Sequence, residues 1–263
     1  MRTATPLDEF TVFCQGFQRL TGLDLTQYKR AQMERRVRTF VERRGHDGLS
    51  AYLAVLRVDG VELEAFLDRV TINVSELWRH PEQFQTLARH VLPALAAETG
   101  RVRAWSAGSS YGAEAYTLAA VCRTAIPGAQ VSITGTDIDR RMVERARGGR
   151  FSREDARGVP AAELKRWFEA DGEGWRAREE LRRIVRFEQG DLLRLRPRPA
   201  SYDLVLCRNT AIYFSEEVRD QLHARLADSL RPGGVLLVGA TERVADPRGA
   251  GLTPIHPFTY RKA

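Results

Sequence analysis

The sequence predicts an α/β protein: a doubly wound, Rossmann-like domain preceded by an all-α domain. From residue 101 onward, short apolar strands alternate with helical segments, the pattern that builds a parallel sheet with helices on both faces. Residues 7–85 instead show helical periodicity without strand alternation. A glycine turn follows the first strand and an acid ends the second, as in the nucleotide-binding half of such a sheet.

The all-α domain is assigned to residues 1–85. Apolar residues recur with a helical period, and Gly22 and Gly45 stand where helices would end. The helices are expected at residues 10–20, 28–44, 49–56 and 61–70. A further helix at about 82–99 would lead into the second domain, residues 86–263.

The second domain alternates strands and helices along its length. Strands are expected at residues 102–107, 130–136, 183–188, 202–207 and 234–239, with helices at 113–124, 139–147 and 215–230 and a terminal hairpin within 252–261. The alternation breaks in the middle of the domain. We therefore expect an inserted subdomain at about residues 151–187, projecting between the second helix and the third strand.

Composition narrows the class of protein. No apolar run approaches the roughly 18 residues that would span a bilayer, and the N-terminus lacks the apolar core of a signal peptide. We expect a soluble, cytoplasmic protein without membrane insertion. The three cysteines form no Cys-x-x-Cys pair, so neither a disulfide framework nor a metal site is expected.

The helix at residues 28–44 is strongly basic. Seven basic residues lie between positions 27 and 46, against two acidic ones. The basic residues are Lys29, Arg30, Arg35, Arg36, Arg38, Arg43 and Arg44. One interpretation is a solvated helix face. The other is a docking face for an acidic partner, either nucleic acid or an acidic protein.

The glycine turn at residues 108–112 indicates a nucleoside ligand without a phosphate chain. It reads Gly-x-x-x-Gly, which is neither the dinucleotide pattern nor a P-loop. S-adenosylmethionine is the common ligand of this kind, and the small Gly108 would let the backbone approach it. Asp137 would bind the ribose hydroxyls. Its alternative role is a helix N-cap, which Asp139 could equally fill.

Further polar residues follow the predicted strands, where ligands of an open parallel sheet bind. Asp191 with Leu192, and Arg208 with Asn209, stand at such ends. Glu114 either complements the dipole of its helix or faces the charged end of the ligand.

The roles of Tyr213 and Arg79 stay open on composition and spacing alone. Tyr213 either presents its hydroxyl or ring to a sulfonium cation or belongs to the core of the next helix. By composition alone, residues 71–79 form a polar helix–loop segment with Arg79 on the surface.

Four motifs then occur in a fixed order along the chain. They read TINVSELWR at 71–79, WSAGSSYGAEAY at 105–116, TDI at 136–138 and CRNTAIYF at 207–214. In this combination the sequence resembles the chemotaxis receptor glutamate methyltransferases, the CheR family, over about residues 10–260. The resemblance implies an S-adenosylmethionine-dependent enzyme that methylates glutamate side chains on the cytoplasmic helices of chemoreceptors.

The resemblance also assigns roles to individual residues. Arg79, Asn209 and Tyr213 match the family's active-site residues. The positions that match its cofactor contacts or line its cofactor cleft are Thr71, Asn73, Ser75, Arg79, Gly108, Glu114, Asp137, Asp191, Leu192, Asn209 and Thr210. A receptor glutamate would attack the methyl group directly, because its carboxylate is ionised at pH 7 and needs no general base.

The chain departs from the family pattern at several positions. Ala113-Glu114 replaces two adjacent acids, so Glu114 would act alone. Asp191 replaces an asparagine, and a carboxylate can still accept a hydrogen bond from the adenine amine. The stretch at residues 168–175 is shorter than in members that grip a receptor's C-terminal pentapeptide. A pentapeptide-independent enzyme is therefore expected.

Two rival functions stay open. The high isoelectric point, about 9.7, suggests a nucleic-acid methyltransferase, but Asn209-Thr210-Ala211-Ile212 stands where amino-methylating enzymes of that class often show Asn/Asp-Pro-Pro-Tyr. A non-catalytic S-adenosylmethionine-binding module is the second rival. We expect a monomer that docks receptor helices through residues 28–44 and has no nucleic-acid partner.

Overall fold

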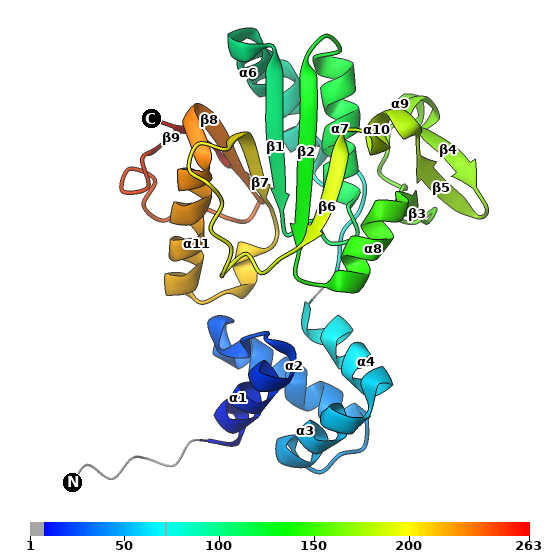
Figure 1. Cartoon of the computed structure of the whole chain (residues 1–263), viewed down its shortest axis with the longest axis vertical. Helices are drawn as coiled ribbons and strands as arrows, with labels where there is room; N and C mark the ends of the chain where they lie inside the picture. The colour runs from blue at the N-terminus through cyan, green and yellow to red at the C-terminus, as the bar shows by residue number, and fades with distance from the viewer. Residues whose placement is uncertain (1–7, 72) are drawn as a thin grey trace. The chain divides into compact units, whose positions relative to one another are not determined.

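The computed structural model describes residues 8–71 and 73–263 and divides into two compact units (Figure 1). The first unit takes the described residues up to 71 together with residues 213–218. The second unit takes residues 73–212 and 219–263. The division therefore falls after residue 72, earlier in the chain than the boundary at 85 that the periodicity predicts.

The first unit contains the four predicted helices. They are α1 (Glu9–Thr21), α2 (Arg30–Arg43), α3 (Leu49–Val58) and α4 (Gly60–Thr71). Asp8 caps α1, where its side chain accepts a hydrogen bond from the amide of Thr11 at 3.2 Å. Helices α1 and α3 approach closely at Gly16, where a Cβ would lie 2.2 Å from Leu53. Aromatic side chains fill the space between the helices, with the Phe66 ring 5.1 Å from Phe17 and edge-on to it.

Residues 213–218 join this helical unit by direct backbone pairing. Tyr28 and Phe214 form an isolated antiparallel bridge, and the amide of Lys29 donates to the carbonyl of Tyr213 at 2.9 Å. The rings of Tyr28 and Phe214 lie 5.1 Å apart. The end of the CRNTAIYF motif is thus held by the first unit, although most of that motif belongs to the second.

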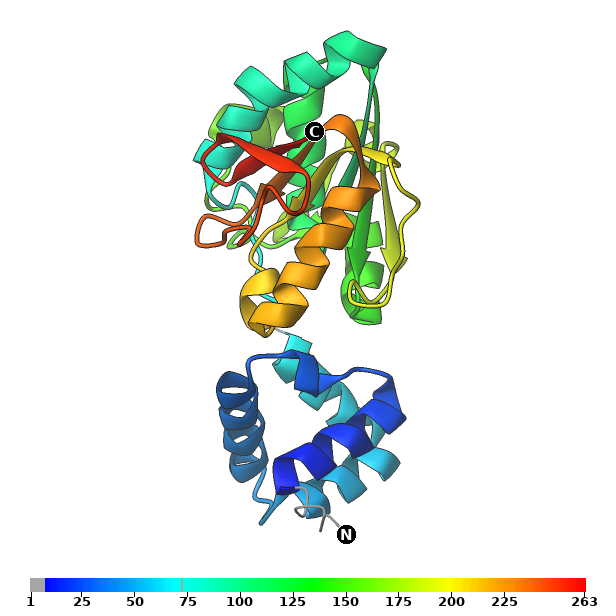
Figure 2. The ribbon, with the colours of Figure 1, turned by 90° about the vertical axis from the view of Figure 1, so that its left-hand side faces the viewer.

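The second unit is a seven-stranded sheet with the order β6-β2-β1-β7-β8-β10-β9. Its strands are β1 (Arg101–Ala107), β2 (Gln130–Asp137), β6 (Val185–Gln189), β7 (Tyr202–Cys207), β8 (Leu230–Val238), β9 (Leu252–His256) and β10 (Thr259–Lys262). The first five are parallel. The hairpin of β9 and β10, red in Figure 2, adds two antiparallel strands beyond β8. The predicted fold class is confirmed.

Helices cover this sheet. They are α5 (Pro81–Thr86), α6 (Leu92–Thr99), α7 (Ala113–Ala125), α8 (Arg140–Gly148) and α11 (Glu216–Ser229). A π-helical turn (Leu87–Val91) joins α5 to α6, so the predicted helix at 82–99 is one interrupted helix. Helix α6 packs on β1, α7 on β2, and α8 on β6. The buried core lies between these layers.

The insertion is a small three-stranded sheet with the order β3-β5-β4. Its strands are β3 (Arg150–Phe151), β4 (Phe168–Asp171) and β5 (Gly174–Ala177), with the short helices α9 (Ala161–Trp167) and α10 (Glu179–Arg182). Residues 185–187, which the prediction gave to the insertion, instead belong to β6 of the main sheet. Their pairing with β2 takes them out of the subdomain.

Residues 73–80 explain why the second unit begins where it does. Polar contacts fix this segment to the α/β unit along its length, although its composition is that of a loop. The side chain of Asn73 donates to Asp139 at 2.8 Å, the amide of Leu77 to the carbonyl of Asp155 at 3.0 Å, and the amide of Trp78 to Thr117 at 3.1 Å. The hydroxyl of Tyr111 reaches the carbonyl of Ser75. Sequence periodicity carries no trace of such contacts.

Across residues 8–71 and 73–263, the longest apolar helical stretches fall short of what a membrane crossing requires.

Candidate active site

The strand order reverses between β1 and β7, the point at which an open parallel sheet of this kind forms a crevice. From β1 the chain continues to β2 and β6 on one side, whereas β7 leads to β8 on the other. Ligands of open parallel sheets bind where the order reverses, beyond the carboxyl ends of the strands. Gly108 follows β1 and Arg208 follows β7. The predicted turn and the CRNTAIYF motif therefore flank one crevice.

Gly108 and Thr210 touch across this crevice. The backbone of Gly108 is left-handed, with φ of +82°, and an added Cβ would lie 2.4 Å from the hydroxyl oxygen of Thr210. Only glycine meets both demands. The conformation of the turn is thus set partly by a loop about a hundred residues away along the chain.

Asp137 ends β2 beside the turn and is buried. Its carboxylate accepts hydrogen bonds from the amide of Ser110 at 2.7 Å and the amide of Asp139 at 3.0 Å. Burial raises the pKa of Asp137, and these hydrogen bonds act against that rise. Asp139 fills the N-cap of α8 by accepting from Arg141 and Met142. The capping alternative for Asp137 is therefore taken by Asp139.

The turn also holds two buried hydroxyls without partners in the described part of the chain. The side-chain oxygens of Ser109 and Ser110 are buried and accept or donate no hydrogen bond there. Buried polar atoms are normally paired. Beside Asp137, these hydroxyls and the half-buried Gly108 suit a polar, nucleoside-like ligand.

Asp191 and Leu192 follow β6 at the same edge of the sheet. One oxygen of Asp191 accepts from the amide of Leu193 at 2.8 Å, and the other lies 3.4 Å from the guanidinium of Arg194. Leu192 is buried. The pair thus offers one apolar side chain and a partly engaged carboxylate.

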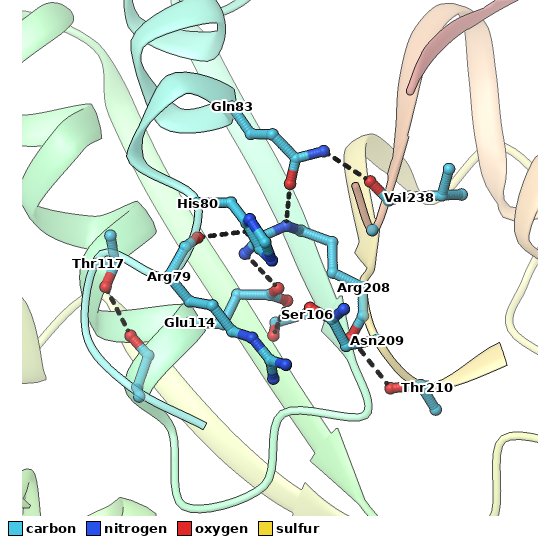
Figure 3. A network of polar contacts seen from close by, with 12 residues as sticks. Arg79, His80, Gln83, Ser106, Glu114, Thr117, Arg208, Asn209, Thr210 and Val238 are labelled. Carbon is cyan, nitrogen blue, oxygen red and sulfur yellow. Dashed lines mark hydrogen bonds and ion pairs between the residues drawn. The ribbon is translucent and has the colours of Figure 1, made fainter. Parts of the chain in front are cut away.

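A buried network joins Ser106, Gln83, Glu114 and Arg208 (Figure 3). Arg208, whose side chain is 2% exposed, pairs with the carboxylate of Glu114 at 3.1 Å. It also donates to the side chain of Gln83 at 2.7 Å and to the carbonyl of Arg79 at 2.5 Å. The other oxygen of Glu114 accepts from Ser106 at 2.7 Å. Both oxygens of Glu114 therefore have protein partners before any ligand is considered.

Arg79 sits in an unusual stretch of backbone. Trp78 and His80 on either side are both left-handed, with φ of 58° and 57°. Non-glycine residues rarely adopt this conformation, and each costs about 1 kcal/mol or more. The carbonyl of Arg79 is held by Arg208, and its guanidinium donates to the carbonyl of Val74 at 2.9 Å. In Figure 3 the side chain of Arg79 extends toward Asn209.

Comparison with known proteins matches nearly all of this chain. The family "CheR methyltransferase, all-alpha domain" matches residues 8–71, and "CheR methyltransferase, SAM binding domain" matches residues 73–252. A chemotaxis protein methyltransferase of Listeria innocua is 32% identical over 255 residues, covering 97% of each chain. One of Salmonella typhimurium is 29% identical over 247 residues, covering 90% of this chain and 84% of its own.

The chain belongs to the CheR methyltransferase family. The resemblance that the four motifs indicate is confirmed. The family boundary between residues 71 and 73 coincides with the division of the structure.

S-adenosylmethionine is accordingly the cofactor of the second unit, and the crevice residues fit it. Asp137 and the hydroxyls of Ser109 and Ser110 are polar groups of the kind that a nucleoside ligand needs. Leu192 is an apolar side chain at the same edge of the sheet.

The structure brings six predicted site residues of this CheR protein to one edge of the second unit. Gly108, Asp137, Asp191 with Leu192, and Asn209 with Thr210 lie at or just after the carboxyl ends of strands of its sheet. Thr71 and Tyr213 instead belong to the first unit. The hydroxyl of Thr71 donates to the carbonyl of Leu67 at 2.8 Å.

Several supporting residues were missed at the level of sequence. The sequence places Arg208 at a strand end beside Asn209 but does not show that it links Glu114, Gln83 and Arg79. Tyr111 carries no role predicted from the sequence, yet its hydroxyl contacts the segment before Arg79. The signals available in the sequence were an arginine directly after a predicted strand and a tyrosine between two glycines. Their partners lie too far along the chain to be inferred from spacing.

Helix α2 of the first unit carries paired and unpaired charges. Arg30 pairs with Asp8, Arg38 with Glu9 and Glu34, and Arg44 with Glu62. Arg35 and Arg43 are exposed, and neither forms an ion pair within the described residues.

Arg36 of the same helix differs from its neighbours. Its guanidinium carbon lies 5.8 Å from the centre of the Tyr213 ring. Its Nη1 atom is buried without a partner in the described part of the chain, and burial lowers the pKa of Arg36.

Proposed function

We propose that this CheR-family enzyme transfers the methyl group of S-adenosylmethionine to glutamate side chains on the cytoplasmic helices of methyl-accepting chemoreceptors, and that it works in the cytoplasm. The observation that carries the proposal is the arrangement at Arg79. A guanidinium held on a strained backbone at the crevice is suited to a carboxylate, because its planar fork matches the two oxygens.

The proposed reaction is an in-line displacement. The glutamate oxygen attacks the methyl carbon as the bond to sulfur breaks, and the sulfonium becomes the neutral thioether of S-adenosylhomocysteine. Arg79 binds the second carboxylate oxygen, Asn209 lies beside the reacting methyl, and Tyr213 orients the methyl or the carboxylate. Positioning and partial desolvation supply the rate enhancement.

The cofactor is proposed to bind along the crevice edge. Asp137 accepts from the ribose hydroxyls, and Asp191 with Leu192 takes the adenine. The glycine turn at Gly108 and the loop at Asn209 and Thr210 enclose the methionine part. Thr71, Asn73 and Ser75 precede Arg79 in the segment expected to line the cleft.

The role of Glu114 is proposed more narrowly than the sequence suggested. Its two oxygens are engaged by Ser106 and Arg208. A carboxylate can accept more than two hydrogen bonds, so Glu114 could also accept one from the ammonium group of the cofactor.

The test is transfer of labelled methyl to a receptor cytoplasmic fragment. We expect label on glutamate methyl esters of the receptor fragment and none on DNA or RNA. Hydrolysis of these esters in base releases the label as methanol. Arg79→Ala should lower turnover about a hundredfold or more and leave the affinity for S-adenosylhomocysteine within about threefold of wild type. The matched control is Arg57→Ala, which removes an exposed arginine of α3 and should leave both unchanged.

Other outcomes would contradict the proposal. Label on nucleic acid would favour the rival methyltransferase, and cofactor binding without any transfer would favour a binding module. Equal turnover by Arg79→Ala and wild type would remove Arg79 from the mechanism.

Helix α2 is the proposed receptor-docking element. The exposed Arg35 and Arg43 and the half-buried Arg36 beside Tyr213 give it unpaired positive charge. Charge of this kind accelerates encounter with an acidic surface and is screened by salt. Arg35→Glu with Arg43→Glu should lower kcat/KM for the fragment at least tenfold at low salt and little at high salt. The same double change to Lys is the control.

The insertion supports a pentapeptide-independent enzyme. Strands β4 and β5 are joined by only Gly172 and Glu173, and Gly172 has φ of 59°. This two-residue turn agrees with the short insertion that the sequence predicts. Receptor fragments with and without a C-terminal pentapeptide should be methylated at equal rates. A large gain from the pentapeptide would overturn this part of the proposal.

A further inference from the structure

A buried acid organises the loop that carries Asn209. Glu242 follows β8 and is 4% exposed. Its carboxylate accepts three backbone hydrogen bonds, from Gly239 at 2.7 Å, Asn209 at 2.8 Å and Ile212 at 3.1 Å. One side chain therefore ties the loop after β8 to the loop after β7.

Among the described residues, the carboxylate of Glu242 is stabilised by backbone amides and by no cation. Within the described residues, no lysine or arginine forms an ion pair with it. Burial raises the pKa of Glu242, and the three N–H donors act against that rise. A buried carboxylate is costly unless it is hydrogen-bonded. Any apolar replacement would leave three amides without a partner.

The bonded loop holds a strained residue. Asn209 is left-handed, with φ of 57°, a conformation that asparagine tolerates better than most residues. Gly239 makes room for the arrangement, because a Cβ there would lie 2.4 Å from the Glu242 carboxylate and 2.8 Å from the amide of Asn209. These three residues fix one another's positions.

We propose that Glu242 is a positioning residue for methyl transfer, which aims Asn209 by holding its amide and sets the start of the turn to Tyr213 by holding Ile212. This inference rests on the proposed function, since it takes Asn209 as the residue beside the reacting methyl. Glu242 acts only through the backbone of that loop.

Glu242→Gln tests this role with almost no change in size. The amide group of glutamine must turn an N–H toward one of the three donors, so at least one bond is lost. We expect kcat to fall about tenfold to a hundredfold, the effect of a small misplacement at a reacting centre, with KM for the receptor fragment within about twofold. The amides of Asn209 and Ile212 should exchange with solvent at least tenfold faster.

Asp203→Asn is the matched control. Asp203 is another buried acid, 1% exposed, at the opposite end of β7, where it accepts from the amide of Arg103 and from Arg231. It should lower the urea midpoint without changing kcat at a temperature where the protein is folded. A comparable loss of kcat in Asp203→Asn would mean that stability alone explains the effect and would overturn the proposal.

Two further results separate the remaining cases. Wild-type kcat and wild-type amide exchange in Glu242→Gln would overturn the positioning role. If the glutamine variant does not fold, Glu242→Asp, which keeps the charge but shortens the reach, takes its place with the same expectations. If the wild-type enzyme methylates no receptor fragment, the proposed function fails, and the amide exchange of Asn209 and Ile212 still decides whether Glu242 holds the loop.

Discussion

Arginine plays opposite parts in two regions of this molecule. Arg208 of the second unit is buried and makes hydrogen bonds to Glu114, Gln83 and the carbonyl of Arg79. On helix α2 of the first unit, Arg38 lies at the surface in pairs that water screens. Arginine therefore holds a backbone carbonyl in place in one region and carries a solvated surface charge in the other. Burial decides between these roles, because it removes the water that would otherwise solvate the charge.

The largest effect should come from breaking the buried network. Arg208→Met leaves Glu114 buried without its cation, and loss of one partner of such a pair costs about 3–5 kcal/mol. We expect this loss in the free energy of unfolding, measured by urea denaturation. Arg208→Met combined with Glu114→Gln should recover part of it. A loss under about 1 kcal/mol would mean that Arg208 behaves like a surface arginine.

A second buried group should appear in the pH dependence of stability. His223 on α11 is 1% exposed, and burial lowers its pKa from 6.5 to about 4. Between pH 6.5 and about 4, this histidine is therefore protonated in the unfolded chain and neutral in the folded protein. The free energy of unfolding keeps its full value above about pH 6.5 and falls as pH drops toward 4, by about 3 kcal/mol in total.

Replacing the histidine tests this prediction. His223→Leu should weaken the acid dependence of the urea midpoint between about pH 7 and pH 4.5, whereas His90→Gln, at an exposed position, should leave it as in wild type. An unchanged acid dependence in His223→Leu would show that other groups cause it.

A smaller effect is expected where a buried acid has only amide partners. Asp137→Asn keeps the shape but removes the charge that would bind the ribose hydroxyls. Affinity for S-adenosylhomocysteine, measured by titration calorimetry, should fall about tenfold to a hundredfold. This is the free energy that a hydrogen bond to a charged group typically contributes. Asp139→Asn is the control, since asparagine also caps helices. Equal losses in the two variants would argue against a ribose contact by Asp137.

The smallest effect should come from the surface of α2. Arg38→Ala removes ion pairs with Glu9 and Glu34, and exposed pairs of this kind contribute about 0–1 kcal/mol. The urea midpoint should shift only slightly, and less still at high salt. A loss above about 2 kcal/mol would remove the contrast with Arg208.

Much of this architecture could be predicted from local signals. The helices of the first unit and the five parallel strands followed from hydrophobic periodicity, which reflects burial along one element at a time. A strand end and a glycine turn have short-range signatures, so the positions of Asp137 and Gly108 at the ends of strands could be predicted.

The boundary between the units and the supports of the site could not be found in that way. Asn73 to Arg79 read as a loop, yet long-range hydrogen bonds assign them to the α/β unit. Glu242 looked like one acid among many until the structure placed three amides around it.

The sequence by itself determined the order of helices and strands, the family of this protein, and the residue types that its site can use. These depend on spacing and on motifs a few residues long. Only the tertiary structure decided which charges are buried, what holds Arg79 and Asn209, and that Tyr213 pairs with the helical unit. The reason is physical: burial and hydrogen bonding join groups that lie a hundred residues or more apart in the chain.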